Sequence, residues 1–517
     1  MEGLTVALPP GAERAHAVED VSFSLAPGEI LCIVGESGSG KSVSAAAMMG
    51  LLPPALRPVA GRIMFEGRDI LRCAPAELRA LRGARIGMVF QEPMTALNPL
   101  LRVRDQVAEV MRVHGVRVGN RVQDMLEAVG LPDPRAIARA YPHQLSGGQR
   151  QRVMIAAALA LEPAILIADE PTTALDVTTQ MQILQLIRGL QARRGMGVVF
   201  ITHDFGVVAE IADRVAVMQR GRIVEQGAAD AVLGAPRHGY TRQLIAAMPH
   251  GVPRARPPAP GQPLLELVAV RKTYGGRRAA PAVQGATLRI ARGETLGLVG
   301  ESGSGKSTLA RCVVRLAVPE SGAIRFDGAD LRPLSRAAWK PYRKRIQMVF
   351  QDPAASLNPR RRVRDIIAEG PVAHGQPRAA AHARALQLLA LVQLDPGAAD
   401  RFPHEFSGGQ RQRIGIARAL AMDPELLIAD EPVSALDVSV QAQVLALLAD
   451  LRARLGLTML FITHDLRVAA QVCDRVAVMQ GGVIVEQGAT AELFARPAHP
   501  YTRALLDSIP GRRRALR

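Results

Sequence analysis

An octapeptide rich in glycine and serine occurs twice in this chain of 517 residues, at 35–42 and at 300–307. Both copies read Gly-Glu-Ser-Gly-Ser-Gly-Lys-Ser, follow an apolar run typical of a buried strand, and precede a segment typical of a helix. In such a loop, glycines let backbone N–H groups converge on phosphate oxygens, and the helix N-terminus adds partial positive charge. A glycine-serine loop can match this pattern by chance, but the flanking elements and the repetition make chance negligible. Two phosphate-binding loops are therefore predicted.

The side chains of the two loops have distinct expected roles. We expect Lys41 and Lys306 to reach the β- and γ-phosphates of a nucleotide, and the hydroxyl groups of Ser42 and Ser307 to bind Mg²⁺. The remaining residues expected to contact the nucleotide are Gly35, Ser37, Gly38, Gly40 and Val43 in the first loop and Gly300, Ser302, Gly303, Gly305 and Thr308 in the second.

An acidic pair follows an apolar strand in each half of the chain, Asp169-Glu170 and Asp430-Glu431. A carboxylate in this place lies at the carboxyl edge of a parallel sheet, where ligands bind. We expect Asp169 and Asp430 to hold Mg²⁺, directly or through water, and Glu170 and Glu431 to polarise an attacking water. One acidic pair after a strand would be weak evidence for a nucleotide site, whereas two pairs at matched spacing from a phosphate-binding loop are strong evidence.

Each half also has a histidine and a glutamine at the end of a predicted strand, namely His203 and Gln91, and His464 and Gln351. A histidine in this place is more often structural, but its duplication at equal spacing after each glutamate favours a contact with the γ-phosphate. A glutamine at a strand end can reach Mg²⁺ or the attacking water, and by itself it favours neither. The predicted catalytic set includes all four residues, and both glutamines are candidate ligands of Mg²⁺.

A Ser-Gly-Gly-Gln turn occurs at 146–149 and at 407–410, before helices predicted to begin at Arg150 and Arg411. A turn of this kind at a helix N-terminus is a second anion site. One phosphate can hardly occupy two helix N-termini of the same small domain. We therefore predict two domains that face each other head to tail, each turn closing on the phosphate-binding loop of the other domain.

The two halves of the chain align almost throughout, which indicates an internal repeat. Strands predicted at 30–34, 86–90, 165–168 and 197–202 alternate with helices predicted within 100–145 and at 178–194, so we expect an α/β fold with a parallel sheet. Short alternating stretches in 3–34 predict a small antiparallel sheet. The predicted domains are 1–248 and 264–517, with helical sub-domains at about 95–150 and about 355–411. A proline-rich linker is predicted at 249–263.

Composition narrows the function classes. No run of about 18 uncharged apolar residues occurs, and Met1–Asp20 lacks the apolar core of a signal peptide, so we expect a cytosolic chain or one docked on a membrane from the cytosolic side. The net charge of +17 is typical of proteins with nucleic-acid, anionic-lipid or nucleotide partners. The four cysteines have no metal-ligand or disulfide spacing, and we expect them to be small buried apolar residues.

With these motifs together, the chain resembles the ATP-binding-cassette (ABC) ATPases, with two complete cassettes in tandem. The resemblance covers nearly the whole chain and includes Ala-Leu-Asp at 174–176 and 435–437. It implies in each cassette a RecA-like parallel-sheet core with an antiparallel β sub-domain and a helical sub-domain. It also implies two ATP molecules sandwiched between the cassettes. Site one would combine Lys41, Ser42, Gln91, Asp169, Glu170 and His203 with Ser407, Gly409 and Gln410. Site two would combine Lys306, Ser307, Gln351, Asp430, Glu431 and His464 with Ser146, Gly148 and Gln149.

Narrower marks resemble the oligopeptide/dipeptide/nickel importer branch of that family. They are Gln-Glu-Pro with Leu-Asn-Pro within 91–99, Gln-Asp-Pro with Leu-Asn-Pro within 351–359, and the ending 496–503 with its worn copy at 236–242. The resemblance implies an ATPase on the cytoplasmic face of the inner membrane, energising uptake of a peptide or similar small solute such as glutathione. It implies two permease subunits and an extracytoplasmic substrate-binding protein as partners, with permease helices received near 95–140 and 355–400. Some relatives hold an iron–sulfur cluster near this ending, but we expect none here because the last cysteine is Cys473.

The two halves differ where the family stacks adenine on an aromatic ring. Tyr274 precedes the second loop, whereas the same count back from the first loop reaches Pro9, and the first aromatic residue is Phe23. The second loop also ends in Ser307-Thr308, one hydroxyl more than Ser42-Val43. We therefore expect weaker nucleotide affinity at the Lys41 site, with its chemistry intact.

Two rival functions are open at this point. The charge of +17 favours a soluble twin-cassette ATPase that acts on nucleic acid or ribosomes. The short proline-rich linker and the absence of zinc-binding cysteine spacing disfavour it, so we expect no nucleic-acid partner. An ATPase that drives export is disfavoured only by the resemblance to the import branch.

Overall fold

The computed structural model describes residues 1–173, 175–249, 251–253, 262–275, 280–434 and 436–511. The chain divides into two compact units, one formed mainly by Met1–Leu175 and Thr179–Met248 and the other mainly by Pro249–Ile509. Within the described ranges, no helix combines the length and the apolar character that crossing a membrane requires.

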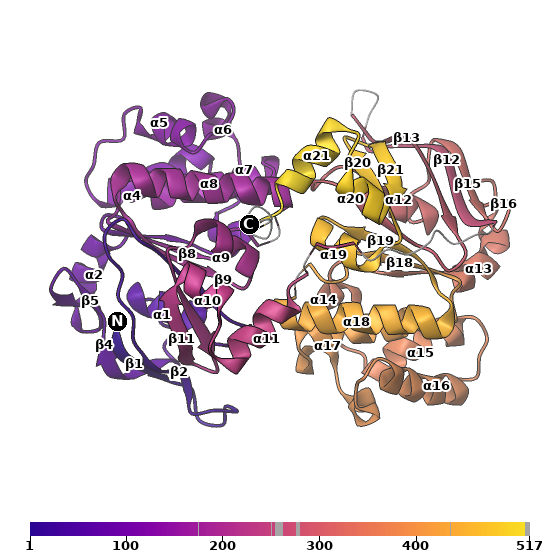
Figure 1. Cartoon of the computed structure of the whole chain (residues 1–517), viewed down its shortest axis with the longest axis horizontal. Helices are drawn as coiled ribbons and strands as arrows, with labels where there is room; N and C mark the ends of the chain where they lie inside the picture. The colour runs from indigo at the N-terminus through magenta and orange to yellow at the C-terminus, as the bar shows by residue number, and fades with distance from the viewer. Residues whose placement is uncertain (174, 250, 254–261, 276–279, 435, 512–517) are drawn as a thin grey trace. The chain divides into compact units, whose positions relative to one another are not determined.

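The first unit contains eleven strands and eleven α-helices in its described part (Figure 1). The strands are β1 (Glu2–Ala7), β2 (His16–Val21), β3 (Ile30–Val34), β4 (Arg57–Arg62), β5 (Met64–Phe65), β6 (Arg68–Asp69), β7 (Ile86–Val89), β8 (Ile165–Asp169), β9 (Gly197–Thr202), β10 (Arg214–Gln219) and β11 (Arg222–Ala228). The helices are α1 (Lys41–Met48), α2 (Pro75–Leu81), α3 (Pro93–Ala96), α4 (Val103–Val113), α5 (Arg121–Ala128), α6 (Pro134–Arg139), α7 (Gly147–Ala158), α8 (Val177–Arg194), α9 (Phe205–Ile211), α10 (Ala229–Gly234) and α11 (Gly239–Ala247).

The second unit repeats this order. Its strands are β12 (Pro263–Thr273), β13 (Pro281–Ala291), β14 (Thr295–Val299), β15 (Ser321–Phe326), β16 (Ala329–Asp330), β17 (Ile346–Val349), β18 (Leu426–Asp430), β19 (Thr458–Thr463), β20 (Arg475–Gln480) and β21 (Val483–Ala489). Its helices are α12 (Lys306–Val313), α13 (Arg336–Arg345), α14 (Pro353–Ser356), α15 (Val363–Ala373), α16 (Arg378–Leu391), α17 (Gly408–Leu420), α18 (Val438–Leu455), α19 (Leu466–Val472), α20 (Thr490–Ala495) and α21 (Pro500–Asp507).

A six-stranded sheet forms the centre of each unit. In the first unit its order is β11-β10-β3-β9-β8-β7, and every neighbouring pair is parallel except β10 with β11. The register pairs Val34 with Thr202 and Asp169 with Ile201, so the ends of β3, β9 and β8 lie level. The second unit has the equivalent order β17-β18-β19-β14-β20-β21. The parallel register therefore brings the ends of four strands to one edge of each sheet, which is where the predicted site residues follow.

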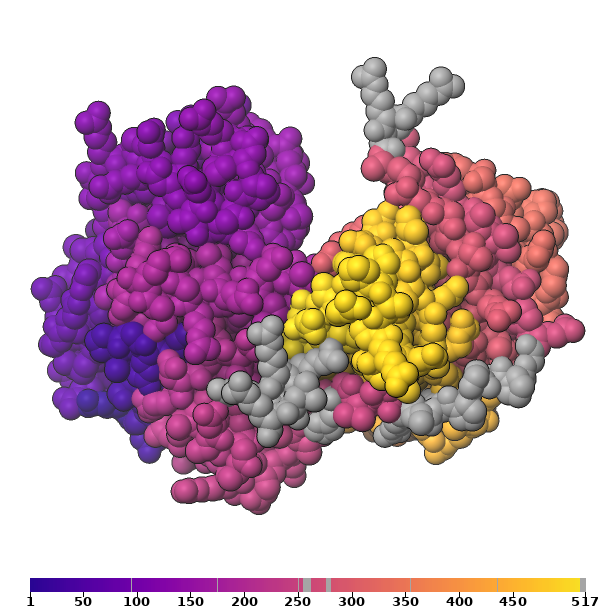
Figure 2. Space-filling model, turned by 45° about the horizontal axis from the view of Figure 1, so that its top comes forward, coloured from indigo at the N-terminus to yellow at the C-terminus, as the bar shows by residue number. Residues whose placement is uncertain are grey.

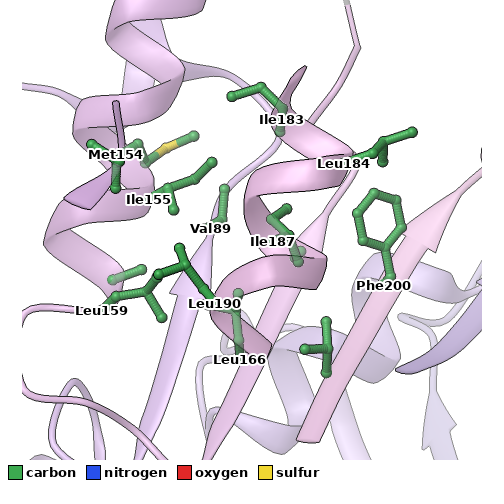
Figure 3. Close-up of a cluster of buried hydrophobic side chains, with 14 of the residues drawn as sticks. Val89, Met154, Ile155, Leu159, Leu166, Ile183, Leu184, Ile187, Leu190 and Phe200 are labelled. Carbon is green, nitrogen blue, oxygen red and sulfur yellow. The ribbon is translucent and has the colours of Figure 1, made fainter. Parts of the chain in front are cut away.

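Apolar side chains cover both faces of each sheet. In β9, Val198 and Phe200 belong to one buried cluster, whereas Val199 and Ile201 belong to another, because successive strand residues point to opposite faces. This explains why the strands read as continuous apolar runs instead of alternating ones. Figure 3 shows the first cluster, where side chains from α7 and α8 pack against Val89, Leu166 and Phe200 of the sheet. Truncating the fully buried Phe200 to alanine would cost about 3–5 kcal/mol.

Smaller sub-domains flank the central sheets. An antiparallel sheet in the order β2-β1-β4 packs with α1 in the first unit, and the order β13-β12-β15-β16 is its counterpart in the second. Helices α3 to α7 and α14 to α17 contribute the helical sub-domains. In Figure 2, residues near the C-terminal end of the second unit, in yellow, form one continuous patch on the visible face of that unit. The predicted fold class, an α/β core with antiparallel and helical sub-domains in each of two units, is confirmed.

Four details differ from the sequence-based expectations. Strand β7 ends at Val89, and Phe90 is 44% exposed instead of continuing the strand. Helices α7 and α17 begin at Gly147 and Gly408, three residues earlier than predicted, because the preceding serine caps each helix. Cys73 is only partly buried, unlike the other three cysteines. Strand β12 begins at Pro263 within the predicted linker, whose limits stay a prediction because 254–261 lie outside the described residues.

Candidate active site

The two phosphate-binding loops connect β3 to α1 and β14 to α12, as their flanking sequences predict. Glycine is required where the loop passes close to another strand, because a Cβ on Gly35 would lie 2.2 Å from the Met218 carbonyl oxygen. At the helix start, Gly40 and Gly305 have φ values of 103° and 104°, which other residues rarely adopt. The octapeptide therefore has its composition for steric as well as chemical reasons.

Both loop lysines are buried against the backbone of their own loop. Lys41 Nζ donates to the carbonyl oxygens of Gly35 and Glu36 at 2.7 and 2.9 Å. Lys306 Nζ donates to those of Gly300 and Glu301 at 2.8 and 2.7 Å. Burial lowers the pKa of Lys306, although nearby carboxylates oppose the shift. Each ammonium group is thus held at the centre of the loop whose N–H groups would bind phosphate.

A serine hydroxyl and an aspartate meet at the start of the helix in each unit. Ser42 Oγ lies 3.2 Å from Asp169 Oδ1, and Ser307 Oγ lies 3.0 Å from Asp430 Oδ1. The two aspartates are buried, with exposed fractions of 6% and 3%. Burial raises the pKa of Asp169 and of Asp430, and the charge of the neighbouring glutamate adds to the increase.

These groups fit a bound Mg²⁺ nucleotide. A hydroxyl next to a carboxylate that burial destabilises is a suitable oxygen donor set for a hard divalent cation. In the first loop Ser39 Oγ is buried without a hydrogen-bond partner among the described residues, so this hydroxyl can donate to a phosphate oxygen. Mg²⁺ bound there would neutralise charge on the phosphates of the nucleotide.

Two predicted catalytic side chains, a glutamine and a histidine, converge on one carboxylate oxygen of the third, the glutamate. Glu170 Oε2 lies 3.2 Å from Gln91 Nε2 and 3.3 Å from His203 Nδ1. In the second unit the same contacts at Glu431 Oε2 measure 2.9 Å to Gln351 and 3.1 Å to His464. In this conformation each histidine and each glutamine therefore orients the glutamate, and the predicted contacts of these side chains with the γ-phosphate and Mg²⁺ stay predictions.

The glutamate and the histidine form an ion pair in each unit. Burial opposes the charge on Glu170, but the hydrogen bond and the charge of His203 outweigh it and lower the pKa of Glu170 to about 2. The same causes lower the pKa of Glu431. The pKa of His203 and that of His464 are raised, because the paired carboxylate outweighs burial. Both glutamates are therefore carboxylates at neutral pH and can accept a hydrogen bond from water.

The same two glutamates have strained backbones. Glu170 and Glu431 have φ values of 45° and 46°, in the left-handed region that disfavours residues with a Cβ, at a typical cost of about 1–3 kcal/mol. The backbone N–H of Glu170 donates to the Ile201 carbonyl oxygen at 3.0 Å, which extends the pairing with β9 by one residue. The turn directs the side chain toward His203 at the adjacent strand end. Sequence reasoning placed these residues at a strand end but could not predict this conformation.

The Ser-Gly-Gly-Gln turns cap α7 and α17. In the first unit, Ser146 Oγ accepts from Gln149 N at 3.3 Å, while Gln149 Oε1 accepts from Ser146 N at 2.9 Å. Ser407 and Gln410 make the same reciprocal pair. A Cβ on Gly409 would lie 2.2 Å from Val440 Cγ1. Close packing against α18 is therefore a sufficient reason for glycine at this position, whether or not it contacts a nucleotide. Both helix N-termini present exposed residues, and their predicted contact with nucleotide stays a prediction.

The strand register corrects the position equivalent to Tyr274, the tyrosine predicted to stack on adenine. Because β1 pairs Ala7 with His16 and β12 pairs Thr273 with Pro281, the residue that matches Tyr274 is Leu8 and not Pro9. Tyr274 is 48% exposed, so its ring is accessible to an adenine. The first unit instead directs the Arg14 guanidinium to the Gly38 carbonyl oxygen of the phosphate-binding loop. Sequence reasoning missed Arg14, and one arginine in a chain so rich in arginine gives no signal.

The pH dependence of stability follows from the ion pairs. The contribution of Glu170 to the free energy of unfolding is present above its ordinary pKa of 4.5 and is lost as the pH falls toward 2. The histidine contribution is present below its ordinary pKa of 6.5 and is lost as the pH rises through the raised value. We expect the Tm deficit of a His203→Gln/His464→Gln chain to be largest between about pH 5 and about pH 6 and smaller at about pH 9. A deficit that stays constant across these pH values would contradict the assigned pairing.

Comparison with known sequences matches this chain to two families. The profile of the ABC transporter family matches residues 18–173 and 283–434, once in each half. The profile of the oligopeptide/dipeptide transporter C-terminal region matches 224–276 and 485–517. The second pair of matches includes both copies of the ending that sequence analysis singled out.

Individual relatives cover nearly the whole chain. The peptidoglycan transport ATP-binding protein YejF of Agrobacterium fabrum is 48% identical, over 97% of this chain and 94% of its own length. The glutathione import ATP-binding protein GsiA of Salmonella choleraesuis is 46% identical, over 99% of this chain and 89% of its own length. Among solved structures, cbiO1 of Clostridium perfringens, described as part of an ABC transporter complex, is 32% identical over 45% of this chain and 91% of its own, with a TM-score of 0.42.

These findings agree with a site that places a phosphate-binding loop, an acidic pair, a histidine and a glutamine at one sheet edge in each unit. The profile matches and the full-length identity exceed what a shared fold alone would give. The chain is an ATP-binding ATPase that belongs to the ABC transporter family, with two cassettes in one polypeptide.

Proposed function

We propose that this protein is the ATP-hydrolysing subunit of an importer for peptides or a similar small solute, such as a dipeptide, an oligopeptide or glutathione. The observation that carries the proposal is the match of the oligopeptide/dipeptide transporter C-terminal region in both halves. The name of one relative, a glutathione import ATP-binding protein, supports the direction of transport and the solute class. The name of another, a peptidoglycan transport ATP-binding protein, supports a transport function. The solute itself is selected by partner proteins, so this chain defines a class of solute and no single compound.

The proposed chemistry is hydrolysis of ATP at two sites. In each, the loop lysine binds the phosphates, and the serine and the aspartate hold Mg²⁺, with Gln91 or Gln351 as a further ligand. Glu170 and Glu431 accept a hydrogen bond from the attacking water. The left-handed turn and the partners of each carboxylate support this role, because they fix its orientation before the nucleotide arrives.

Each proposed site is completed by the Ser-Gly-Gly-Gln turn of the other cassette. Lys41 works with Ser407, Gly409 and Gln410, and Lys306 works with Ser146, Gly148 and Gln149. Ser146 and Ser407, which begin the two turns, are exposed and support this pairing, because a helix N-terminus exposed to solvent is available to a phosphate. ATP that bridges the two cassettes would shift the population toward a closed pairing, and hydrolysis would release it.

The proposed partners are two integral-membrane permease subunits and an extracytoplasmic substrate-binding protein. The protein would then be peripheral on the cytoplasmic face of the inner membrane. We propose that the permease contact lies on the helical sub-domains, which begin after the glutamine that follows β7 or β17. Leu100 in this region is 83% exposed and adjoins Leu101, which is 41% exposed, and exposed apolar residues are typical of interaction surfaces.

Reconstitution tests this proposal directly. The full chain, co-expressed with a permease and a substrate-binding protein of the oligopeptide/dipeptide class, should co-purify with the permease in detergent. In proteoliposomes, ATP turnover should rise when a peptide mixture or glutathione is added with the binding protein. A Glu170→Gln/Glu431→Gln chain is the matched control, because it should assemble but not respond.

The result that would contradict the proposal is a chain that ignores the permease and instead binds RNA or DNA. Nucleic-acid binding that weakens steeply with salt, together with turnover stimulated by ribosomes or nucleic acid, would favour the rival class of soluble twin-cassette ATPases. The net charge of +17 makes weak binding at low salt expected in either case, so the comparison requires physiological salt.

A further inference from the structure

The His-x-Tyr-Thr-Arg segment, at 238–242 and 499–503, begins the last described helix of each unit. His238 caps α11, and its Nδ1 accepts a hydrogen bond from Tyr240 N at 3.2 Å. His499 caps α21 and accepts from Tyr501 N at the same distance. The segment thus has a fixed local geometry in both units, although one copy has glycine and the other proline after the histidine.

A glutamate on the preceding strand anchors the segment. Glu225 of β11 accepts hydrogen bonds from Arg237 N at 2.8 Å and His238 N at 3.1 Å. Glu486 of β21 accepts from the two equivalent N–H groups at 2.8 and 3.0 Å. Burial opposes ionisation of Glu225, but these hydrogen bonds outweigh it and lower the pKa of the side chain. The tyrosine is therefore held at a defined place relative to the edge of the central sheet.

Each tyrosine reaches the phosphate-binding loop of its own unit. The hydroxyl oxygen of Tyr240 accepts a hydrogen bond from Glu36 N at 3.2 Å, and that of Tyr501 accepts from Glu301 N at 3.1 Å. The carbonyl oxygen of the same glutamate accepts from the loop lysine, at 2.9 Å from Lys41. The backbone of the second loop residue is thus held on one side by the tyrosine and on the other by the lysine.

The Tyr501 hydroxyl keeps its proton over the working pH range. Burial, with the nearby Glu301, raises the pKa of Tyr501 to about 12. Tyr240 is 7% exposed, and Tyr501 packs against the apolar core of its unit. Replacing tyrosine with phenylalanine keeps the packed ring and removes only the hydroxyl that contacts the loop. This substitution therefore separates the contribution of ring packing from that of the hydrogen bond.

We propose that Tyr240 and Tyr501 are positioning residues of the two ATP sites, each fixing the second residue of a phosphate-binding loop and thereby the lysine bonded to it. The inference rests on the proposed role of Lys41 and Lys306 as phosphate ligands. It gives the His-x-Tyr-Thr-Arg segment a physical function, because the segment joins the C-terminal region of each cassette to its own loop.

The test measures Mg²⁺-ATP affinity of the full chain by calorimetry, with one loop silenced. In a Lys41→Ala background, which leaves the second loop, Tyr501→Phe is expected to raise the Kd for ATP about fivefold, the loss of one neutral hydrogen bond. Tyr342→Phe is the matched control, since that ring stacks on Trp339 away from the loop, and it should leave the Kd unchanged. In a Lys306→Ala background, Tyr240→Phe should behave alike, with Tyr141→Phe as its control.

A double-mutant cycle separates positioning from stability. If the tyrosine acts through the lysine, adding Tyr501→Phe to Lys306→Ala in the same Lys41→Ala background should weaken ATP binding at the second loop no further. A Kd unchanged by Tyr501→Phe, or a loss that adds in full to that of Lys306→Ala, would overturn the inference. If Lys306→Ala itself leaves ATP affinity unchanged, the proposed phosphate ligand is wrong, and this inference falls with it.

Discussion

Replacing both glutamates, in a Glu170→Gln/Glu431→Gln chain, is expected to lower ATP turnover by about a hundredfold or more while ATP still binds. An amide cannot accept the proton of the attacking water and is a weaker acceptor for its hydrogen bond. The structure adds a specific reason, because the pKa of Glu170 falls to about 2 and the carboxylate is fully charged when ATP arrives. The measurement is phosphate release at saturating ATP, with ATP binding followed in parallel.

Two exposed glutamates supply controls for this experiment. Glu162 pairs only at the surface with Arg194, and Glu492 lies exposed in the first turn of α20. Glu162→Gln and Glu492→Gln should therefore leave turnover close to that of the unaltered chain. Turnover in the Glu170→Gln/Glu431→Gln chain within about twofold of the unaltered chain would contradict the assigned role.

Removing one loop lysine is expected to weaken ATP binding at that loop by about tenfold to a hundredfold, because a charged hydrogen-bond donor to phosphate is lost. The two variants should differ. Lys41→Ala leaves the second loop with Tyr274, whereas Lys306→Ala leaves the first loop, which has Leu8 in the equivalent position. Since aromatic stacking contributes about 0.5–1.5 kcal/mol, the Lys41→Ala chain should bind ATP about two- to tenfold more tightly than the Lys306→Ala chain.

Equal ATP affinities of the two variants would refute the predicted asymmetry. Lys344→Ala is the control, because this lysine is exposed in α13, away from the loop. A Lys41→Ala/Tyr274→Ala chain tests the cause, since it should bring the second loop down to the affinity of the first. Turnover per bound ATP should be similar at the two loops, because Glu170 and Glu431 have matching partners.

Most of the fold could be predicted because buried parallel strands leave a strong signal. Strand β9 has the bounds that its apolar run predicts, and β8 differs by one residue. The residues at strand ends could also be placed at one edge of the sheet, because parallel strands present their carboxyl ends together. The internal repeat made the assignment of the motifs more specific, because each motif occurs in both halves at nearly the same spacing.

The contacts that sequence reasoning missed depend on tertiary packing. No local pattern shows that the Tyr240 hydroxyl reaches Glu36, because the two residues are joined only when β11 and α11 fold back onto the sheet. The recurrence of His-x-Tyr-Thr-Arg was visible, but its spacing carried no known chemistry. The left-handed conformation of Glu170 was likewise unpredictable, because glutamate has no preference for it and the strand ends impose it.

The central claim is that each ATP site is completed by the opposite cassette, and trapped ATP in the full chain tests it most directly. The background is the Glu170→Gln/Glu431→Gln chain, in which one loop lysine and one Ser-Gly-Gly-Gln turn are also mutated. The ATP that stays bound to each variant through gel filtration is then quantified. A chain with Lys41→Ala and Ser407→Arg, which damage the same site, should still retain ATP at the other site, whereas a chain with Lys41→Ala and Ser146→Arg should retain none. The opposite pattern, with ATP retained only by the Lys41→Ala/Ser146→Arg chain, would contradict the central claim.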